Sequence, residues 1–126
     1  MSGFRQPGDN RELIVETGTT LTIGPGDAGK VFCNVGAAGN IAYTVQSAAL
    51  FRPGDEIKIL SAAAGTTTVS FTAGQLITFN DVAANSVALS TTNEIIGGGF
   101  IFTCVSASKW HCQFLCEETQ TVTVAT

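Results

Sequence analysis

The chain has 126 residues, a formal net charge of −4 and only 13% charged residues, roughly half the charged share of an ordinary soluble domain. This length suits one domain. The six basic residues are scattered and form no stripe that could follow a phosphate backbone, and no apolar stretch approaches the roughly 20 residues that span a bilayer. We therefore expect one domain whose partners include neither nucleic acid nor membrane.

Residues 1–12, "MSGFRQPGDNRE", differ from the rest of the chain because they combine charges, a proline and turn formers. They contain no hydrophobic segment of the signal-peptide type, which predicts assembly in the cytoplasm. Two interpretations of this segment stay open. It is either a flexible terminus or an extended arm that becomes ordered on a partner surface.

From residue 13 onward, short runs rich in β-branched and aromatic residues alternate with turn formers, about every 8 to 12 residues. No segment has a sustained helical period. We predict an all-β domain over residues 13–126, an antiparallel β-sandwich or barrel of jelly-roll or β-tulip type. The runs are "LIVE", "TLTI", "KVFCNV", "IAYTV", "EIKIL", "TTTVSF", "QLITF", "SVALS", "GGGFIFTCV", "KWHCQFL" and "TQTVTVAT".

Turn chemistry suggests how these runs connect. The glycine-flanked segment 36–40 predicts a hairpin-like turn between "KVFCNV" and "IAYTV". The sequence Pro-Gly-Asp at 53–55 predicts a tight turn before a strand, and Asn-Asp at 80–81 predicts another. Only "TVQSAALF" could hold a single helical turn.

The four cysteines are Cys33, Cys104, Cys112 and Cys116, and His111 is the only histidine. No C-x-x-C spacing is present, so we expect no metal site. The cysteines lie in apolar runs and are predicted to be small buried hydrophobes. A disulfide would require close pairing of the strands around 104 and 112, and a cytosolic origin disfavours it.

The sequence predicts no catalytic residue and no cofactor-binding residue. It contains no G-x-S-x-G, P-loop or H-E-x-x-H motif. His111 follows Trp110 in the middle of a predicted strand and has no evident acid–base partner. We therefore expect a protein that is not an enzyme.

The order of elements from residue 20 to 80 resembles small β modules of tailed bacteriophage virions, among them capsid decoration (cement) proteins and head fibres. The likeness rests on "GDAGKVF", a glycine-flanked hairpin, "YTVQSAA", "PGDEIKIL", a Thr/Val strand, and later "GGGFIFTCV" and a Lys-Trp strand. It implies a homotrimer on the outer surface of an icosahedral head. It also implies that the major capsid protein is the partner and that an N-terminal arm contacts it. The candidate contact residues are Phe4, Arg5, Arg11 and Glu12.

Asp81 is the only charged residue between Ile59 and Asn93. Uncharged surface is easier to bury against another protein, because no ion loses its hydration. The stretch from Ser61 to Asn93 is therefore the expected seam between copies, with Val69 and Phe71 as candidate residues. The alternative to a seam is a sheet whose Ser and Thr side chains face water.

The alternative function is a phage fibre or spike module that binds a host receptor or glycan. Such a module would expose aromatic side chains to sugars, whereas Tyr43 and Trp110 lie in alternating runs that predict burial. A cupin-type enzyme would need a cluster of metal-binding histidines, which one histidine cannot supply.

Overall fold

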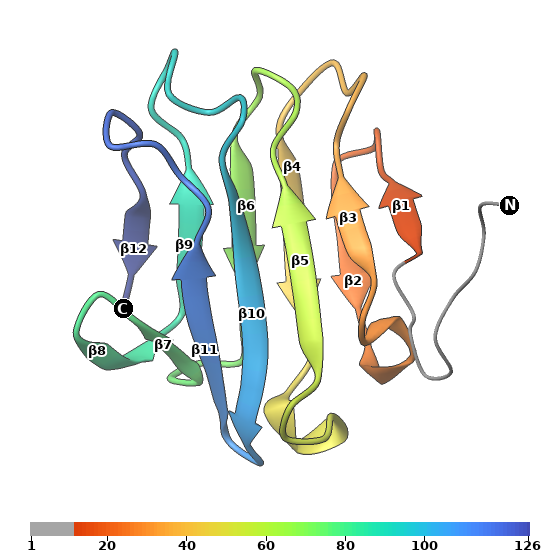
Figure 1. Ribbon diagram of the computed structural model, residues 1–126, viewed down its shortest axis with the longest axis vertical. Coiled ribbons are helices and arrows are strands. Elements are labelled where there is room, and N and C mark those ends of the chain that lie inside the picture. Colours follow the sequence, from red (N-terminus) through yellow and green to blue (C-terminus); the bar gives the residue numbers. More distant parts are fainter. Residues whose placement is uncertain (1–11) are drawn as a thin grey trace, which may run out of the picture.

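The computed structural model of the chain describes residues 12–126, in which two β-sheets stack face to face around one core (Figure 1). The predicted all-β sandwich is confirmed. Short 3₁₀ helices, η1 at Pro25–Asp27 and η2 at Ala48–Leu50, are the helical elements of this part of the chain. The second of them lies in "TVQSAALF", where a single helical turn was predicted.

The larger sheet has seven strands in the order β1-β3-β5-β10-β11-β7-β8. Apolar and polar residues alternate along most of them, so each strand turns one row of side chains inward. The strands are β1 Leu13–Val15, β3 Val31–Cys33, β5 Glu56–Leu60, β7 Leu76–Thr78, β8 Asp81–Ala84, β10 Gly99–Ser106 and β11 Lys109–Phe114.

The smaller sheet has five strands in the order β12-β9-β6-β4-β2. Its inward positions are branched or aromatic, for example Ile41, Tyr43 and Val45 of β4. The strands are β2 Thr20–Ile23, β4 Ile41–Val45, β6 Thr67–Ser70, β9 Ser86–Leu89 and β12 Thr123–Ala125.

The first six strands alternate between the two sheets, so that the chain winds through three stacked turns (Figure 1). Strands β1, β3 and β5 are parallel neighbours in the larger sheet. Strands β2, β4 and β6 are parallel neighbours in the smaller one. The predicted hairpin at 36–40 is therefore wrong, because this segment carries the chain from one sheet to the other. The sandwich is mixed and not purely antiparallel.

The later strands close the two sheets with mainly antiparallel pairs. Strand β10 pairs with both β5 and β11, and β9 pairs with both β6 and β12. The turn predicted at 80–81 joins β7 to β8, where Phe79 and Asn80 both have positive φ.

The core fills the space between the sheets with large side chains. Trp110, Tyr43 and Phe32 are among the largest of these, and all are buried. The Trp110 and Phe51 rings meet edge to face with centroids 4.7 Å apart, and the Phe71 and Phe102 rings do so at 4.8 Å. These arrangements are favourable for aromatic quadrupoles.

The cysteine prediction holds for three of the four residues. Cys33, Cys104 and Cys112 are buried, Cys116 is half-buried, and all four are free thiols. Burial, which disfavours the thiolate, raises the pKa of Cys112 to about 12. Burial likewise raises the pKa of the Tyr43 phenol to about 12.

Candidate functional site

The outer face of the five-stranded sheet carries only small, uncharged side chains. Two rows of residues in register cross all five strands, and every position is Thr, Ser or Ala. One row is Thr20, Ala42, Thr68, Ala88 and Thr123, and the other is Thr22, Thr44, Ser70, Ser86 and Ala125. We call these ten residues the neutral face. Strands lie about 4.8 Å apart, so the face is roughly 19 Å wide.

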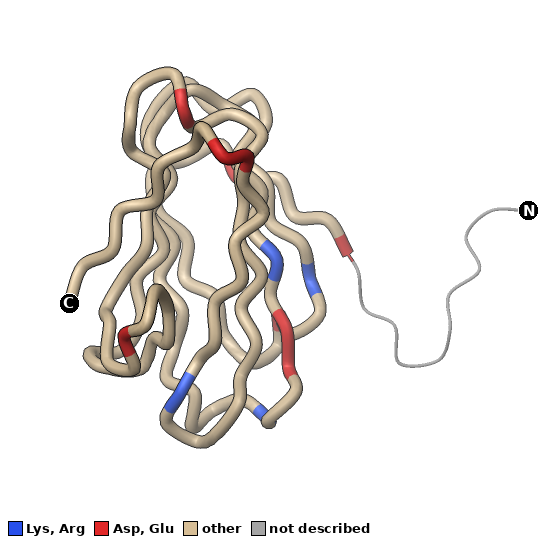
Figure 2. Tube along the Cα trace, turned by 60° about the vertical axis from the view of Figure 1, so that its left-hand side comes forward, with Lys and Arg blue, Asp and Glu red and all other residues tan. Residues whose placement is uncertain are grey.

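The described charged residues lie outside the five strands of this sheet. Figure 2 shows them along strands of the seven-stranded sheet and in loops. Glu56 and Lys58 are in β5, for example, and Lys109 is in β11. The Lys109 ammonium donates to the backbone carbonyls of Gly74 and Val82. A surface that meets the neutral face therefore displaces water from no ion.

The outer face of the seven-stranded sheet is different, because aliphatic and charged side chains are mixed on it. Leu13 and Val15 of β1 are both exposed. Val31 of β3 lies in register between Leu13 and Lys58. Val82 of β8 and Val105 of β10 are also exposed. At the β1 edge of the sheet, Leu13, Val15 and Val31 lie on neighbouring strands, and we call these three residues the aliphatic strip.

The two seam candidates, Val69 and Phe71, do not lie on the surface. Val69 is fully buried and Phe71 is 8% exposed, and both belong to the core of their own chain. Because they are buried in this way, they cannot contact a neighbouring copy in the folded protein. The prediction that Val69 and Phe71 form the seam is therefore wrong. The outward residues of the same strand are Thr68 and Ser70, which belong to the neutral face.

Of the four predicted arm residues, Phe4, Arg5 and Arg11 lie outside the described part of the chain. Glu12 is exposed beside β3, and its backbone carbonyl accepts a 2.9 Å hydrogen bond from the Val31 amide. The Glu12 carboxylate lies 3.9 Å from the Lys30 ammonium, which also contacts Asp27 at 3.1 Å.

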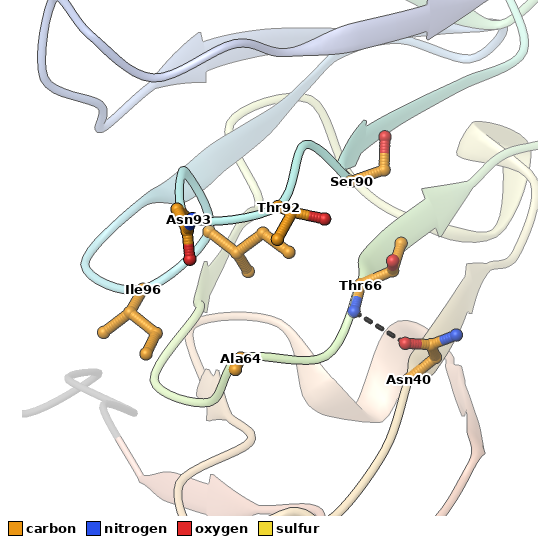
Figure 3. A pocket seen from close by; sticks show the side chains of 8 residues that line it. Asn40, Ala64, Thr66, Ser90, Thr92, Asn93 and Ile96 are labelled. Atoms are coloured by element: carbon orange, nitrogen blue, oxygen red, sulfur yellow. Dashed lines mark hydrogen bonds between the residues drawn. The ribbon is translucent and has the colours of Figure 1, made fainter.

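A pocket of about 460 Å³ opens among three loops at one end of the sandwich (Figure 3). The loops connect β3 to β4, β5 to β6, and β9 to β10. The polar residues that line it are all uncharged, namely Asn40, Thr66, Ser90, Thr92 and Asn93. Ala64, Ile95 and Ile96 complete the lining. We call this the loop pocket.

Hydrogen bonds fix the walls of the loop pocket to one another. The Asn40 side-chain oxygen accepts from the Thr66 amide at 2.8 Å, and the Ile41 amide donates to the Thr66 carbonyl at 2.9 Å. On the other side, Ser61 exchanges backbone hydrogen bonds of 2.8 Å with Gly97 and Gly98. The three loops therefore form one preformed structure.

A glycine is required where two of these loops touch. A Cβ atom on Gly65 would lie 2.3 Å from the backbone carbonyl oxygen of Gly39. Only a residue without a side chain permits that approach. Below the contact, Thr67 is buried with its hydroxyl 3.1 Å from that of Ser61, and the Asn34 side-chain oxygen accepts from the Ala62 amide at 2.7 Å.

Within residues 12–126, no group of three or more His, Cys, Asp or Glu residues has a geometry that could hold a metal ion. None of the helices in this range is both long and apolar enough to cross a membrane. His111 is exposed on the outer face of the seven-stranded sheet, between the buried residues Trp110 and Cys112.

Sequence reasoning missed both the neutral face and the loop pocket. The face has a local signal, since each strand of the five-stranded sheet contains a small-x-small triplet such as "TLT" or "TVS". The pocket has no such local signal, because its loops are far apart in the chain.

Comparison with known proteins finds no matching family model, no matching curated protein and no matching solved structure.

Proposed function

We propose that the protein is a virion structural protein, a cement trimer that binds the outer surface of an icosahedral phage head and stabilises it. The observation that carries the proposal is the neutral face, in which ten outward positions on five strands hold only Thr, Ser or Ala. The sequence resemblance in glycine placement and alternation is the reason for proposing a viral context.

The neutral face is assigned to the seam between copies. Burying it removes no charge from water, whereas burying an unpaired ion costs several kcal/mol. A three-fold ring is heterologous, so each copy presents a second, different surface to its neighbour. The aliphatic strip on β1 and β3 is suited to be that surface, because its exposed Leu13 and Val15 are apolar.

Trimer formation matters for attachment to a shell. A head repeats the same contact many times, so modest affinity at each site becomes strong overall attachment when three sites are linked. The major capsid protein is the proposed partner, and residues 1–12 are the proposed contact. Loss of the seam should therefore weaken head binding even when the fold is intact.

The test mixes purified protein with undecorated phage heads, followed by co-sedimentation and imaging. We expect a trimeric mass and added density on the outer surface of the heads. Thr44→Glu places a charge on the neutral face and should give a monomer with at least about tenfold weaker head binding.

The control is Gln113→Glu, which introduces the same carboxylate at an exposed strand position on the other sheet. It should leave both mass and head binding unchanged. The proposal is wrong if the unmodified protein is a monomer that stays in the supernatant, or if Thr44→Glu remains trimeric and binds heads normally.

A further inference from the structure

We propose that the loop pocket is a binding site for an uncharged saccharide. The pocket lies at the loop end of the sandwich and not on the neutral face, so this activity is additional to attachment to a shell. Its volume of about 460 Å³ falls within the range of about 300 to 1,000 Å³ that is typical of small-molecule sites.

The polar side chains around the pocket have hydrogen-bonding capacity that the described chain does not use. The hydroxyls of Thr66 and Thr92 and the side-chain amide of Asn93 make no hydrogen bond to residues 12–126. Hydroxyl and amide groups both donate and accept, as sugar hydroxyls do. A polyhydroxylated ligand could therefore satisfy several of these groups at once.

The lining excludes charged ligands as good partners. Every polar residue that lines the pocket is neutral. The nearby Glu94 carboxylate is directed elsewhere, since it accepts a 2.7 Å hydrogen bond from the Thr121 hydroxyl. A charged ligand would lose hydration here without gaining a counter-charge, so the site favours neutral sugars.

The apolar part of the lining matches the other property of a sugar ring, which is its C–H surface. Ile96 is 64% exposed at the rim of the pocket, and Ile95 beside it is buried in the core. Figure 3 shows Ala64, Thr66 and Asn40 on one side of the space and Ser90, Thr92 and Asn93 on the other. None of the described residues that line the pocket is aromatic, so a ring between these walls would contact isoleucine instead of stacking on an aromatic side chain.

The site is also preformed, which reduces the entropy lost on binding. The Thr66 amide donates to the Asn40 side-chain oxygen, and Ser61 exchanges backbone hydrogen bonds with Gly97 and Gly98, so the three loops are fixed to one another. Asn93 holds a positive φ of 70°, a conformation that asparagine adopts more readily than most residues. This position orients one wall before any ligand arrives.

The experiment applies the intact protein to an array of neutral, sialylated and sulfated oligosaccharides. The best-retained glycan is then titrated into isotopically labelled protein. We expect retention of neutral glycans and NMR shift changes confined to the amides of residues 40, 64–66 and 90–96. Ile96→Asp adds a charge to the rim and should weaken binding at least about tenfold.

The matched control is Val82→Asp, because Val82 is 65% exposed and lies in β8, outside the pocket lining. It should bind as the unmodified protein does. The proposal is overturned if no neutral glycan is retained, if charged glycans bind equally well, or if Ile96→Asp binds normally. Head binding by Ile96→Asp and saccharide binding by Thr44→Glu should both persist, so failure of one proposal is distinguishable from failure of the other.

Discussion

The two sheets share one core but present opposite outer surfaces. The five-stranded sheet exposes ten small neutral residues in register, whereas the seven-stranded sheet exposes lysine, glutamate and an aliphatic strip. Inward residues of both sheets are mostly apolar and belong to one core. The inner rows form the shared core, so the outer rows can differ in what each face contacts.

The largest expected effect is the difference in stability between substitutions on the inward and outward sides of β6. Val69 and Thr68 are adjacent in β6, but Val69 points into the core and Thr68 points outward. Val69→Asp buries an unpaired charge and should destabilise the fold by more than about 4 kcal/mol. Chemical denaturation should find little or no folded protein.

Thr68→Asp is the matched variant, and it should change the free energy of unfolding by less than about 0.5 kcal/mol. If both variants unfold equally, or if Val69→Asp is as stable as the unmodified protein, the assignment of inward and outward rows is wrong.

The next largest effect is a loss of stability at high pH, which arises from one buried titratable residue in each sheet. Tyr43 lies in the smaller sheet and Cys112 in the larger one, and burial raises the pKa from 10.0 and 9.0, respectively, to about 12. Between the ordinary and raised values, the unfolded chain releases protons that the folded chain retains. The contribution of these two groups to stability should therefore be constant below about pH 8 and fall as the pH rises toward 12.

The difference in pKa at Tyr43 corresponds to about 3 kcal/mol of lost stability. Urea denaturation at a series of pH values measures it. Tyr43→Phe should remove this part of the loss, and at pH 7 it should cost little, because the buried hydroxyl has no hydrogen-bond partner in the described chain. An identical pH dependence in Tyr43→Phe would contradict the assignment.

A smaller loss of stability is expected from a substitution where the β3–β4 and β5–β6 connections touch. Gly65→Ala would force its Cβ against the Gly39 carbonyl and should cost about 1–3 kcal/mol. Gly26→Ala is the control, since nothing lies within 4 Å of its Cβ position, and it should be neutral or slightly stabilising. Equal melting temperatures for the two variants would show that the crossings do not touch as described.

Much of the fold was predictable from local pattern. Alternation with a period of two located β4 and β10, and Pro53-Gly54-Asp55 located the turn before β5. The direction of pairing was not predictable, because a glycine-rich segment such as 36–40 permits either a hairpin or a crossing to the other sheet. The choice between a hairpin and a crossing depends on how the large side chains of both sheets pack together.

The two seam candidates also show what the sequence pattern could not predict. The stretch between Ile59 and Asn93 contains β6 and β9 of the five-stranded sheet, but its lack of charge could not say which row of β6 faces out. Val69 and Phe71 were proposed only because this stretch lacks charge, and large apolar residues of this kind are the ones most often buried in the core of their own chain.

The winding of the first six strands also has a kinetic consequence. Each parallel ladder joins strands that are separated by a complete passage through the opposite sheet. No such ladder can close until the following strand of its own sheet has emerged from the ribosome. High contact order of this kind slows folding, typically into the millisecond-to-second range. The nascent chain should therefore stay open to chaperones until late in its synthesis.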